Sequence, residues 1–243
     1  MDIISLEKIE KTYIQGKLEV KALRGIDLNI GTGEFTAICG PSGSGKTTLL
    51  NIIGCLDNPT SGKALVTGKD ISTLNATQLS NLRLHRIGFV FQAYNLVPVL
   101  TAYENVDLVL SLQGRPKNER TERVIKVLKE VGLSDLASRR PAEMSGGQQQ
   151  RVAVARALVA EPSLILADEP TANLDSQTGK SLLKLMRQLN EEHGVTFLFS
   201  THDSMVMDFS RRIVRIVDGT VAEDYVKDSR GESIETTSIN QQV

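Results

Sequence analysis

Short apolar runs alternate with segments of helical periodicity along most of the chain. The run FTAIC at 35–39 predicts a buried strand. Strands of the same character are predicted at 87–91, 163–168, 195–199 and 212–217. Helical patterns are predicted at 47–56, 76–84, 118–131 and 176–192, and the first of these is expected to bury Leu49, Leu50, Ile53 and Leu56. This alternation predicts an α/β fold.

The two ends of the pattern differ from its middle. Residues 1–38 hold short β-type runs, separated by turn signals such as the glycines at 31–33. From Gln92 to about Ala160 helical patterns dominate, which indicates a helical lobe inserted into the α/β core. We expect a single domain over 1–228, with a core at 1–92 and 160–228 and a lobe at about 93–159. Residues 229–243 are predicted to form a polar, frayed tail.

Composition limits the function. The chain has 243 residues and a net charge of −1, which argues against a non-specific nucleic-acid binder. No apolar run approaches the roughly 18–20 residues needed to span a bilayer, and the N-terminus lacks a signal-peptide core, so we expect a soluble chain. Cys39 and Cys55 stand in apolar surroundings without metal-type spacing, and we expect buried, reduced thiols.

A glycine-rich loop follows the first buried strand and precedes a helix. Its sequence, GPSGSGKT, fits the pattern of a phosphate-binding P-loop, in which backbone N–H groups face the phosphates. Lys46 is expected to reach the β- and γ-phosphates, and the Thr47 hydroxyl to ligate Mg²⁺. The residues predicted to bind ATP here are Gly40, Pro41, Ser42, Gly43, Ser44, Gly45, Lys46, Thr47 and Thr48.

Two adjacent carboxylates end another buried strand, LILADEP. Asp168 is placed to hold Mg²⁺, and Glu169, one residue further, to act as the general base that polarises the attacking water. A carboxylate that only caps the next turn is the alternative.

Three further side chains are candidates for the same site. Gln92 ends a strand and is expected to contact Mg²⁺ and water, with a surface glutamine as the alternative. His202 follows the strand at 195–199, where a histidine can reach a γ-phosphate. Tyr13 is a candidate for stacking on adenine, with an ordinary core or surface tyrosine as a serious competitor. His85 and His193 stand in polar helical contexts and are interpreted as surface residues.

The stretch EMSGGQQQR at 143–151 forms a second phosphate-facing loop that has no lysine. A hydroxyl and two glycines precede a helix that is predicted to start near Gln148, an arrangement that binds anions through N–H groups and the helix dipole. A simple helix cap followed by a polar surface is the alternative.

Taken together, these motifs resemble the nucleotide-binding subunit of ATP-binding cassette (ABC) transporters over nearly the whole chain. They stand in that family's order, as an aromatic A-loop residue at Tyr13, Walker A, a Q-loop at Gln92, the signature MSGGQ, Walker B, a D-loop ANLD and a switch histidine at His202. Met144, where leucine is commoner, and ANLD, where SALD is frequent, are small departures. The residues that the resemblance adds to the ATP site are Ser145, Gly146, Gly147, Gln148 and Asp175.

The resemblance implies a P-loop NTPase (RecA-like) core with an N-terminal antiparallel β-subdomain and an inserted α-helical subdomain. It also implies a homodimer that packs head to tail around two ATP molecules, each chain giving its P-loop to one site and its signature to the other. Catalytic roles are implied for Glu169, His202, Gln92 and Lys46, and Mg²⁺ ligation for Thr47, Gln92 and Asp168.

The residues around and between the motifs are most similar to those of the lipoprotein-releasing and macrolide-exporting branch of the family. This implies ATP hydrolysis that powers export or extraction through separate transmembrane permease subunits, at the cytoplasmic face of the membrane. An importer ATPase stays open as an alternative. A soluble cassette of DNA repair or chromosome structure would carry a longer insertion between the halves, and a ribosomal one would normally have two cassettes. A simple P-loop kinase or GTPase would not explain MSGGQ, and no nucleic acid is expected as a partner.

Overall fold

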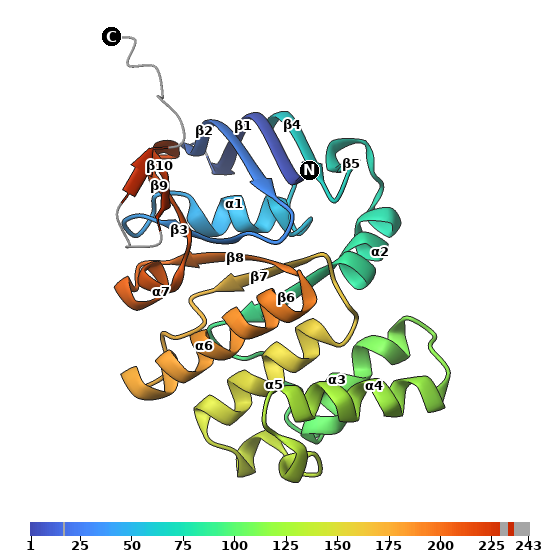
Figure 1. Ribbon diagram of the computed structural model, residues 1–243. Helices are drawn as coiled ribbons and strands as arrows, with labels where there is room; N and C mark the ends of the chain where they lie inside the picture. Colours follow the sequence, from blue (N-terminus) through green and yellow to red (C-terminus); the bar gives the residue numbers. More distant parts are fainter. Residues whose placement is uncertain (17, 229–232, 236–243) are drawn as a thin grey trace.

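A computed structural model describes residues 1–16, 18–228 and 233–235. One helix, α1 (Lys46–Ile53), lies between two β-sheets (Figure 1). The tail predicted over 229–243 lies outside the described residues, apart from the short strand β11 (Ser233–Glu235).

The first sheet is antiparallel and has the order β2-β1-β4-β5. Its two long strands form a hairpin whose pairing shifts register at several points, so the hairpin is irregular rather than flat. The prediction of an N-terminal β-subdomain is confirmed. The strands are β1 (Asp2–Gln15), β2 (Leu18–Gly31), β4 (Ser61–Val66) and β5 (Lys69–Asp70).

The second sheet has the order β11-β10-β9-β3-β8-β7-β6, and its strands from β9 to β6 are parallel. Helices cover both faces of this sheet, which agrees with the P-loop NTPase core that the resemblance implies. Its remaining strands are β3 (Phe35–Cys39), β6 (Ile87–Phe91), β7 (Leu164–Asp168), β8 (Thr196–Thr201), β9 (Arg212–Val217) and β10 (Thr220–Lys227).

Alternate residues of the parallel strands enter two separate cores. In β7, Leu164 and Leu166 pack with α1 and the first sheet, whereas Ile165 and Ala167 pack with the helices on the opposite face. The continuous apolar run of this strand is therefore explained by burial on both faces.

Between β6 and β7 the described chain forms helices, which occupy the lower part of Figure 1. They are α3 (Ala102–Leu112), α4 (Lys117–Glu130) and α5 (Gly146–Leu158), with short 3₁₀ turns at Ser134–Leu136 and Pro141–Glu143. The core contributes α2 (Ala76–Arg86), α6 (Ser176–His193), α7 (Ser204–Phe209) and a 3₁₀ turn at Ile71–Thr73. None of the helices in the described ranges has the length and hydrophobicity of a membrane span.

One packing prediction is wrong. Leu56 was expected on the buried side of the first helix, but α1 ends at Ile53 and Leu56 is 51% exposed. Cys55 adopts a left-handed backbone conformation with φ 57°, which turns the chain away from the helix axis before Leu56. Cys39 and Cys55 are both buried free thiols, as predicted, and burial raises the pKa of Cys55 to about 11.

Candidate active site

The motif residues of the core meet at one edge of the parallel sheet. Strands β3, β8, β7 and β6 are neighbours, and all four end at this edge because they run parallel. A hollow of about 580 Å³ opens there. It is lined by Val20, Lys21, Ala22, Ser42, Gly43, Gly45, Lys46, Thr47, Thr48, Gln92, Asp168, Glu169, Ser200 and His202.

The loop after β3 is shaped by glycines that no other residue could replace without displacement of the backbone around them. Gly40 has φ 150°, and a Cβ there would lie 2.0 Å from the Ile216 carbonyl oxygen. Gly45 has φ 103°, and its Cβ would lie 2.6 Å from the Ala22 carbonyl oxygen. Gly45 is also the N-cap of α1 and provides no capping side chain, so the first N–H groups of this helix stay available to an anion.

Lys46 lies across this loop. Its Nζ donates hydrogen bonds to the carbonyl oxygens of Gly40, at 2.8 Å, and Pro41, at 2.9 Å. The residue is only 9% exposed, so its charge is held in the wall of the hollow. A buried ammonium facing a hollow of this kind is suited to a phosphate ligand.

Asp168 and Glu169 enter the hollow from the end of β7. Burial raises the pKa of the Asp168 carboxyl, while the neighbouring Ser200 hydroxyl lowers it, the Glu169 carboxylate raises it and the Lys46 amine lowers it. A half-buried carboxylate in this position gains stability when a cation binds beside it.

Glu169 occupies the left-handed region with φ 46°, an unfavourable conformation for a side chain of this type. Its carboxylate is fixed by the segment after β8. Oε2 accepts from the Thr201 hydroxyl at 3.0 Å, and Oε1 accepts from the His202 backbone N–H at 3.1 Å and lies 2.6 Å from His202 Nδ1. The structure thus brings the predicted base and the predicted switch histidine into direct contact.

The residues predicted to ligate Mg²⁺ all line the same hollow. Thr47, Gln92 and Asp168 offer a hydroxyl, an amide oxygen and a carboxylate, which are the hard oxygen ligands that Mg²⁺ prefers. Across the described ranges no group of three or more His, Cys, Asp or Glu side chains could hold a metal. A single protein carboxylate completed by substrate phosphates is the usual form of a nucleotide-linked Mg²⁺ site, and these residues fit it.

Tyr13 is not among the residues that line the hollow. Its hydroxyl donates to Asp57 Oδ2 at 2.8 Å, and the Lys11 amine lies 4.9 Å from its ring centroid. Its cross-strand partner, Val20, does line the hollow, together with Lys21 and Ala22. Sequence reasoning missed this wall, because an exposed strand edge has no distinguishing pattern.

The signature residues do not line the hollow of their own chain. Ser145 is exposed and caps α5 in a capping box, in which Gln148 Oε1 accepts from the Ser145 N–H at 2.8 Å. A Cβ on Gly146 would meet the Tyr94 hydroxyl at 2.8 Å, and one on Gly147 would meet Thr178 Cγ2 at 2.4 Å. The glycines therefore fit a tightly packed surface, and α5 begins at Gly146 rather than near Gln148.

Asp175 lies beside the signature as the N-cap of α6. Its Oδ1 accepts from the backbone N–H groups of Gln177, at 3.1 Å, and Thr178, at 3.0 Å. These hydrogen bonds, above all those to Thr178, lower the pKa of the Asp175 carboxyl. Like Ser145, this exposed residue lies outside the hollow.

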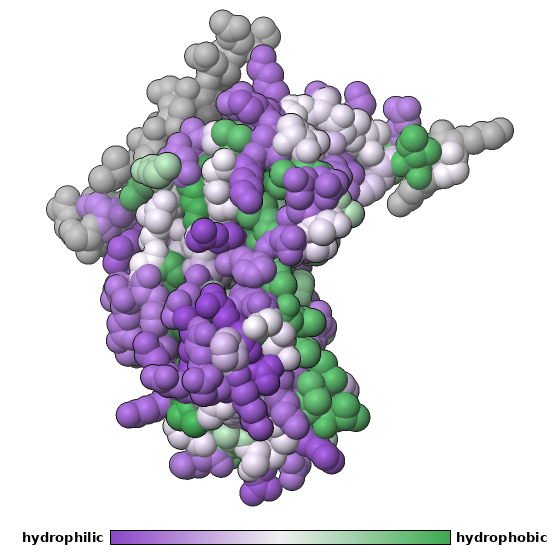
Figure 2. All heavy atoms as spheres, turned by 90° about the vertical axis from the view of Figure 1, so that its right-hand side faces the viewer, coloured by the Kyte–Doolittle hydropathy of each residue, from purple (hydrophilic) through white to green (hydrophobic). Residues whose placement is uncertain are grey.

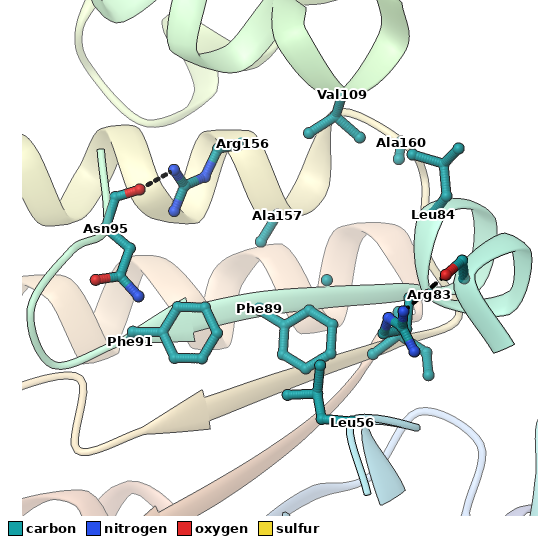
Figure 3. A pocket seen from close by; sticks show the side chains of 13 residues that line it. Leu56, Arg83, Leu84, Phe89, Phe91, Asn95, Val109, Arg156, Ala157 and Ala160 are labelled. Carbon is teal, nitrogen blue, oxygen red and sulfur yellow. Dashed lines mark hydrogen bonds between the residues drawn. The ribbon is translucent and has the colours of Figure 1, made fainter. Parts of the chain in front are cut away.

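A second hollow, of about 450 Å³, lies beside β6, the last strand of the described sheet. We call it the edge groove. Figure 3 shows the rings of Phe89 and Phe91 side by side on β6, between Leu56 and the side chains of Arg156 and Val109. The two rings are stacked, with centroids 5.7 Å apart. The exposure of Leu56 is thus explained by its place in the groove wall.

Comparison with known proteins gives a consistent result. Residues 23–172 match the family model described as ABC transporter. The chain is 49% identical to the lipoprotein-releasing system ATP-binding protein LolD 1 of Rhodopseudomonas palustris, over 91% of this chain and 99% of that protein. It is also 49% identical to an uncharacterized ABC transporter ATP-binding protein of Thermotoga maritima, over 90% of this chain and 93% of that protein.

A third relative is longer than this chain. The macrolide export ATP-binding/permease protein MacB of Syntrophobacter fumaroxidans is 50% identical over 91% of this chain, which spans only 31% of that protein. Among solved structures, the ATP-binding cassette MJ0796 in a dimeric, post-hydrolysis state bound to ADP and Pi has a TM-score of 0.84. Its identity is 45%, and the match covers 92% of this chain and 98% of that one. A protein of that name comes from Methanocaldococcus jannaschii.

Proposed function

This chain belongs to the ABC transporter family of ATPases, and on that premise we propose that two copies close head to tail around two ATP molecules to drive a transporter. Hydrolysis of the bound ATP lets the pair reopen. The cycle is a ligand-driven shift between two assembly states.

The observation that carries this proposal is the position of Ser145. The hollow at the sheet edge has a P-loop, a lysine and carboxylates, whereas the signature that begins at Ser145 lies outside it on an exposed helix N-terminus. The first turn of α5 has no acidic residue, so its N–H groups can donate hydrogen bonds to an anion on another molecule. A second copy of the chain supplies that anion as the γ-phosphate at its own Lys46.

Within each composite site the residues divide the work. Lys46 and the first N–H groups of α1 bind the phosphates, and Tyr13 contributes to the adenine end. Thr47, Gln92 and Asp168 hold Mg²⁺, which when bound neutralises charge on the phosphate oxygens. Glu169 accepts the proton of the attacking water, and His202 orients the Glu169 carboxylate. Asp175 caps α6 and so fixes the surface beside the signature that faces the opposite subunit.

The partner in the membrane is proposed to dock at the edge groove. Its stacked rings and the exposed Leu56 offer an apolar surface to a short amphipathic helix of a permease subunit. Figure 2 looks onto the side of the molecule that carries α2, α3 and α4, and hydrophobic residues gather along one margin of that side. The ATPase then lies at the inner face of the membrane, held by its partner.

The names of the relatives support an exporting or extracting system. LolD belongs to a lipoprotein-releasing system and MacB to macrolide export. We propose a substrate of that type, a lipoprotein, a peptide or a hydrophobic drug. An importer would use the same ATPase with a different membrane subunit, and identification of the protein that co-purifies from detergent-solubilised membranes separates the two.

The composite site is tested by oligomeric state in a slow-hydrolysis background. Glu169→Gln should run as a dimer on size exclusion with ATP and as a monomer without it. Adding Ser145→Arg should abolish that dimer while the monomer still binds ATP, because Ser145 serves the opposite nucleotide. Loss of ATP binding by the monomer, or an unchanged dimer, would contradict the composite site.

A further inference from the structure

The loop after β6, which carries Gln92, is held by a side chain from the helix that begins at the signature. Arg156 on α5 donates to the carbonyl oxygen of Tyr94 at 2.9 Å and also to that of Asn95. We propose that Arg156 is a positioning residue for ATP hydrolysis, which fixes Gln92 relative to α5 from the wall of the edge groove. This inference rests on the proposed function, because it concerns how Gln92 meets the nucleotide.

The backbone at the contact is unusual. Tyr94 and Asn95 are consecutive non-glycine residues in the left-handed region, with φ 59° and 49°. Such a pair is intrinsically unfavourable and persists only where the surroundings fix it. Here both carbonyl groups of the pair meet one guanidinium, whose planar fork can hold two acceptors at once.

The guanidinium of Arg156 is stabilised by these two hydrogen bonds. Burial lowers the pKa of its guanidinium, and both groups to which it donates are neutral carbonyls. A charged group in such a setting depends on its hydrogen bonds for stabilisation, so the loop and the side chain hold each other in place.

Two amide side chains hold the same loop on either side of Gln92. The fully buried Gln150, also on α5, donates through Nε2 to the Phe91 carbonyl at 3.4 Å and to the Pro170 carbonyl at 2.9 Å. Asn173 in the D-loop donates through Nδ2 to the Gln92 carbonyl at 3.0 Å. The strand end that carries Gln92 is therefore tied to α5 and to the segment that follows Glu169.

The same arginine lies in the edge groove. Figure 3 shows Arg156 reaching along α5 to Asn95, beside Phe91, and all three residues line the groove. A helix that enters the groove would contact Arg156 and Asn95 directly. A displacement there would be transmitted to Gln92 through the two carbonyl contacts, since Gln92 is close to both along the chain.

The test is a double-mutant cycle on the full chain, measured as kcat and KM for ATP at saturating Mg²⁺. Arg156→Lys keeps the charge and loses the fork, and we expect kcat to fall roughly tenfold with KM changed by less than about twofold. In a Gln92→Ala background, Arg156→Lys should lower kcat by less than about twofold further, because its effect acts through Gln92.

The matched control is Arg187 on α6, which donates to the Phe209 carbonyl instead. Arg187→Lys should leave kcat near that of the unmodified chain. An equal loss in Arg187→Lys, or the same tenfold loss from Arg156→Lys with and without Gln92, would overturn the inference.

A second variant keeps the inference testable if Arg156→Lys does not fold. Arg156→Gln removes the charge but keeps an amide donor, and it should lower kcat only when Gln92 is present; a loss that persists in Gln92→Ala would overturn the inference. Failure of the proposed function gives a different result, namely an unmodified chain without ATP turnover or a Glu169→Gln variant with normal turnover.

Discussion

Glu169 Oε1 lies 2.6 Å from His202 Nδ1 and also accepts from the His202 backbone N–H, so one oxygen of the carboxylate meets one residue twice. The Glu169 side chain is 16% exposed and that of His202 is 73% exposed. The histidine therefore approaches the carboxylate from the solvent side, where a bound nucleotide and a second subunit would also lie. The contact therefore couples the two residues, and the kinetic effect of replacing each one can be measured.

Replacing the base should stop chemistry without stopping binding. Glu169→Gln removes the proton acceptor but keeps the shape of the side chain, so we expect kcat to fall by about 10²–10⁴-fold. ATP affinity, measured with a fluorescent analogue, should change little. Near-normal turnover would exclude Glu169 as the general base.

Removing the histidine should have a smaller effect of the same kind. His202→Ala leaves Glu169 in place, still held through Oε2 by Thr201, so we expect kcat to fall roughly 10–100-fold with little change in KM. In a Glu169→Gln background the further loss should be small, because the two residues act as a unit. Steady-state kinetics of the four proteins decides this; additive losses would separate the roles.

Asp168 should show a conflict between stability and function. Its raised pKa means that the folded state binds the proton more tightly than the unfolded chain, so the ionised carboxylate lowers stability near neutral pH. Asp168→Asn should therefore raise the unfolding midpoint at pH 7.5, measured without nucleotide or Mg²⁺.

The gain should shrink as pH falls through the raised pKa towards the ordinary carboxyl value of 3.8, because Asp168 is then protonated in the unmodified chain too. The same variant should lose Mg²⁺-dependent hydrolysis. Melting curves at several pH values test the first statement; a stabilisation independent of pH would mean that the charge of Asp168 is not its cause.

The signature glycine offers a rescue experiment. Gly147→Ala places a Cβ 2.4 Å from Thr178 Cγ2 and should lower stability, whereas Thr178→Ser removes that methyl group and should restore it. The next nearest atom, Thr178 Cβ, lies 3.8 Å away, which is ordinary contact. If the glycine also faces the opposite nucleotide, the double variant will regain its melting temperature but not its turnover. Recovery of both the melting temperature and the turnover would mean that Gly147 is required only for packing against Thr178.

Docking at the edge groove should be sensitive to one exposed side chain. Leu56→Glu places a charge in the groove wall and should weaken co-purification of the membrane subunit about tenfold or more, with unchanged ATP turnover by the isolated chain. Ile125 on α4 is comparably exposed, at 58% against 51%, and lies outside the groove, so Ile125→Glu is the control. Equal loss in both variants would point away from the groove.

The sequence predicted the strands that carry chemistry with good accuracy. β3, β6, β7 and β8 all lie where apolar runs are followed by a polar or glycine-rich motif. These signals are local, because a strand buried on both faces must be apolar throughout and its last residue enters the site. The predicted end of the helix at 176–192 agrees within one residue, since Gly194 in the left-handed conformation caps it.

Hydrogen bonds between segments far apart in the chain could not be predicted from the sequence. Arg156 meets carbonyl groups 61 and 62 residues before it, and Asn173 meets one 81 residues before it. A side chain that donates to a backbone carbonyl constrains no residue type at the acceptor, so neither partner leaves a pattern. Asn173 was visible only as a departure from the frequent D-loop sequence, and its contact with the Gln92 carbonyl gives that departure a physical meaning.

The pairing of β7 with β8 aligns Asp168 with Ser200, and the adjacent Glu169 donates its backbone N–H to the Ser200 carbonyl. Successive residues of β7 enter opposite cores, so this register determines which of two consecutive acids reaches which part of the site. The register of β7 therefore matters as much as the identity of its residues. Loss of a single codon within 164–167 would bring Glu169 to the place of Asp168 and leave Pro170 at the place of the base. Selection for activity should therefore remove such a deletion, whereas a one-residue deletion in the exposed stretch at 114–116 should be tolerated.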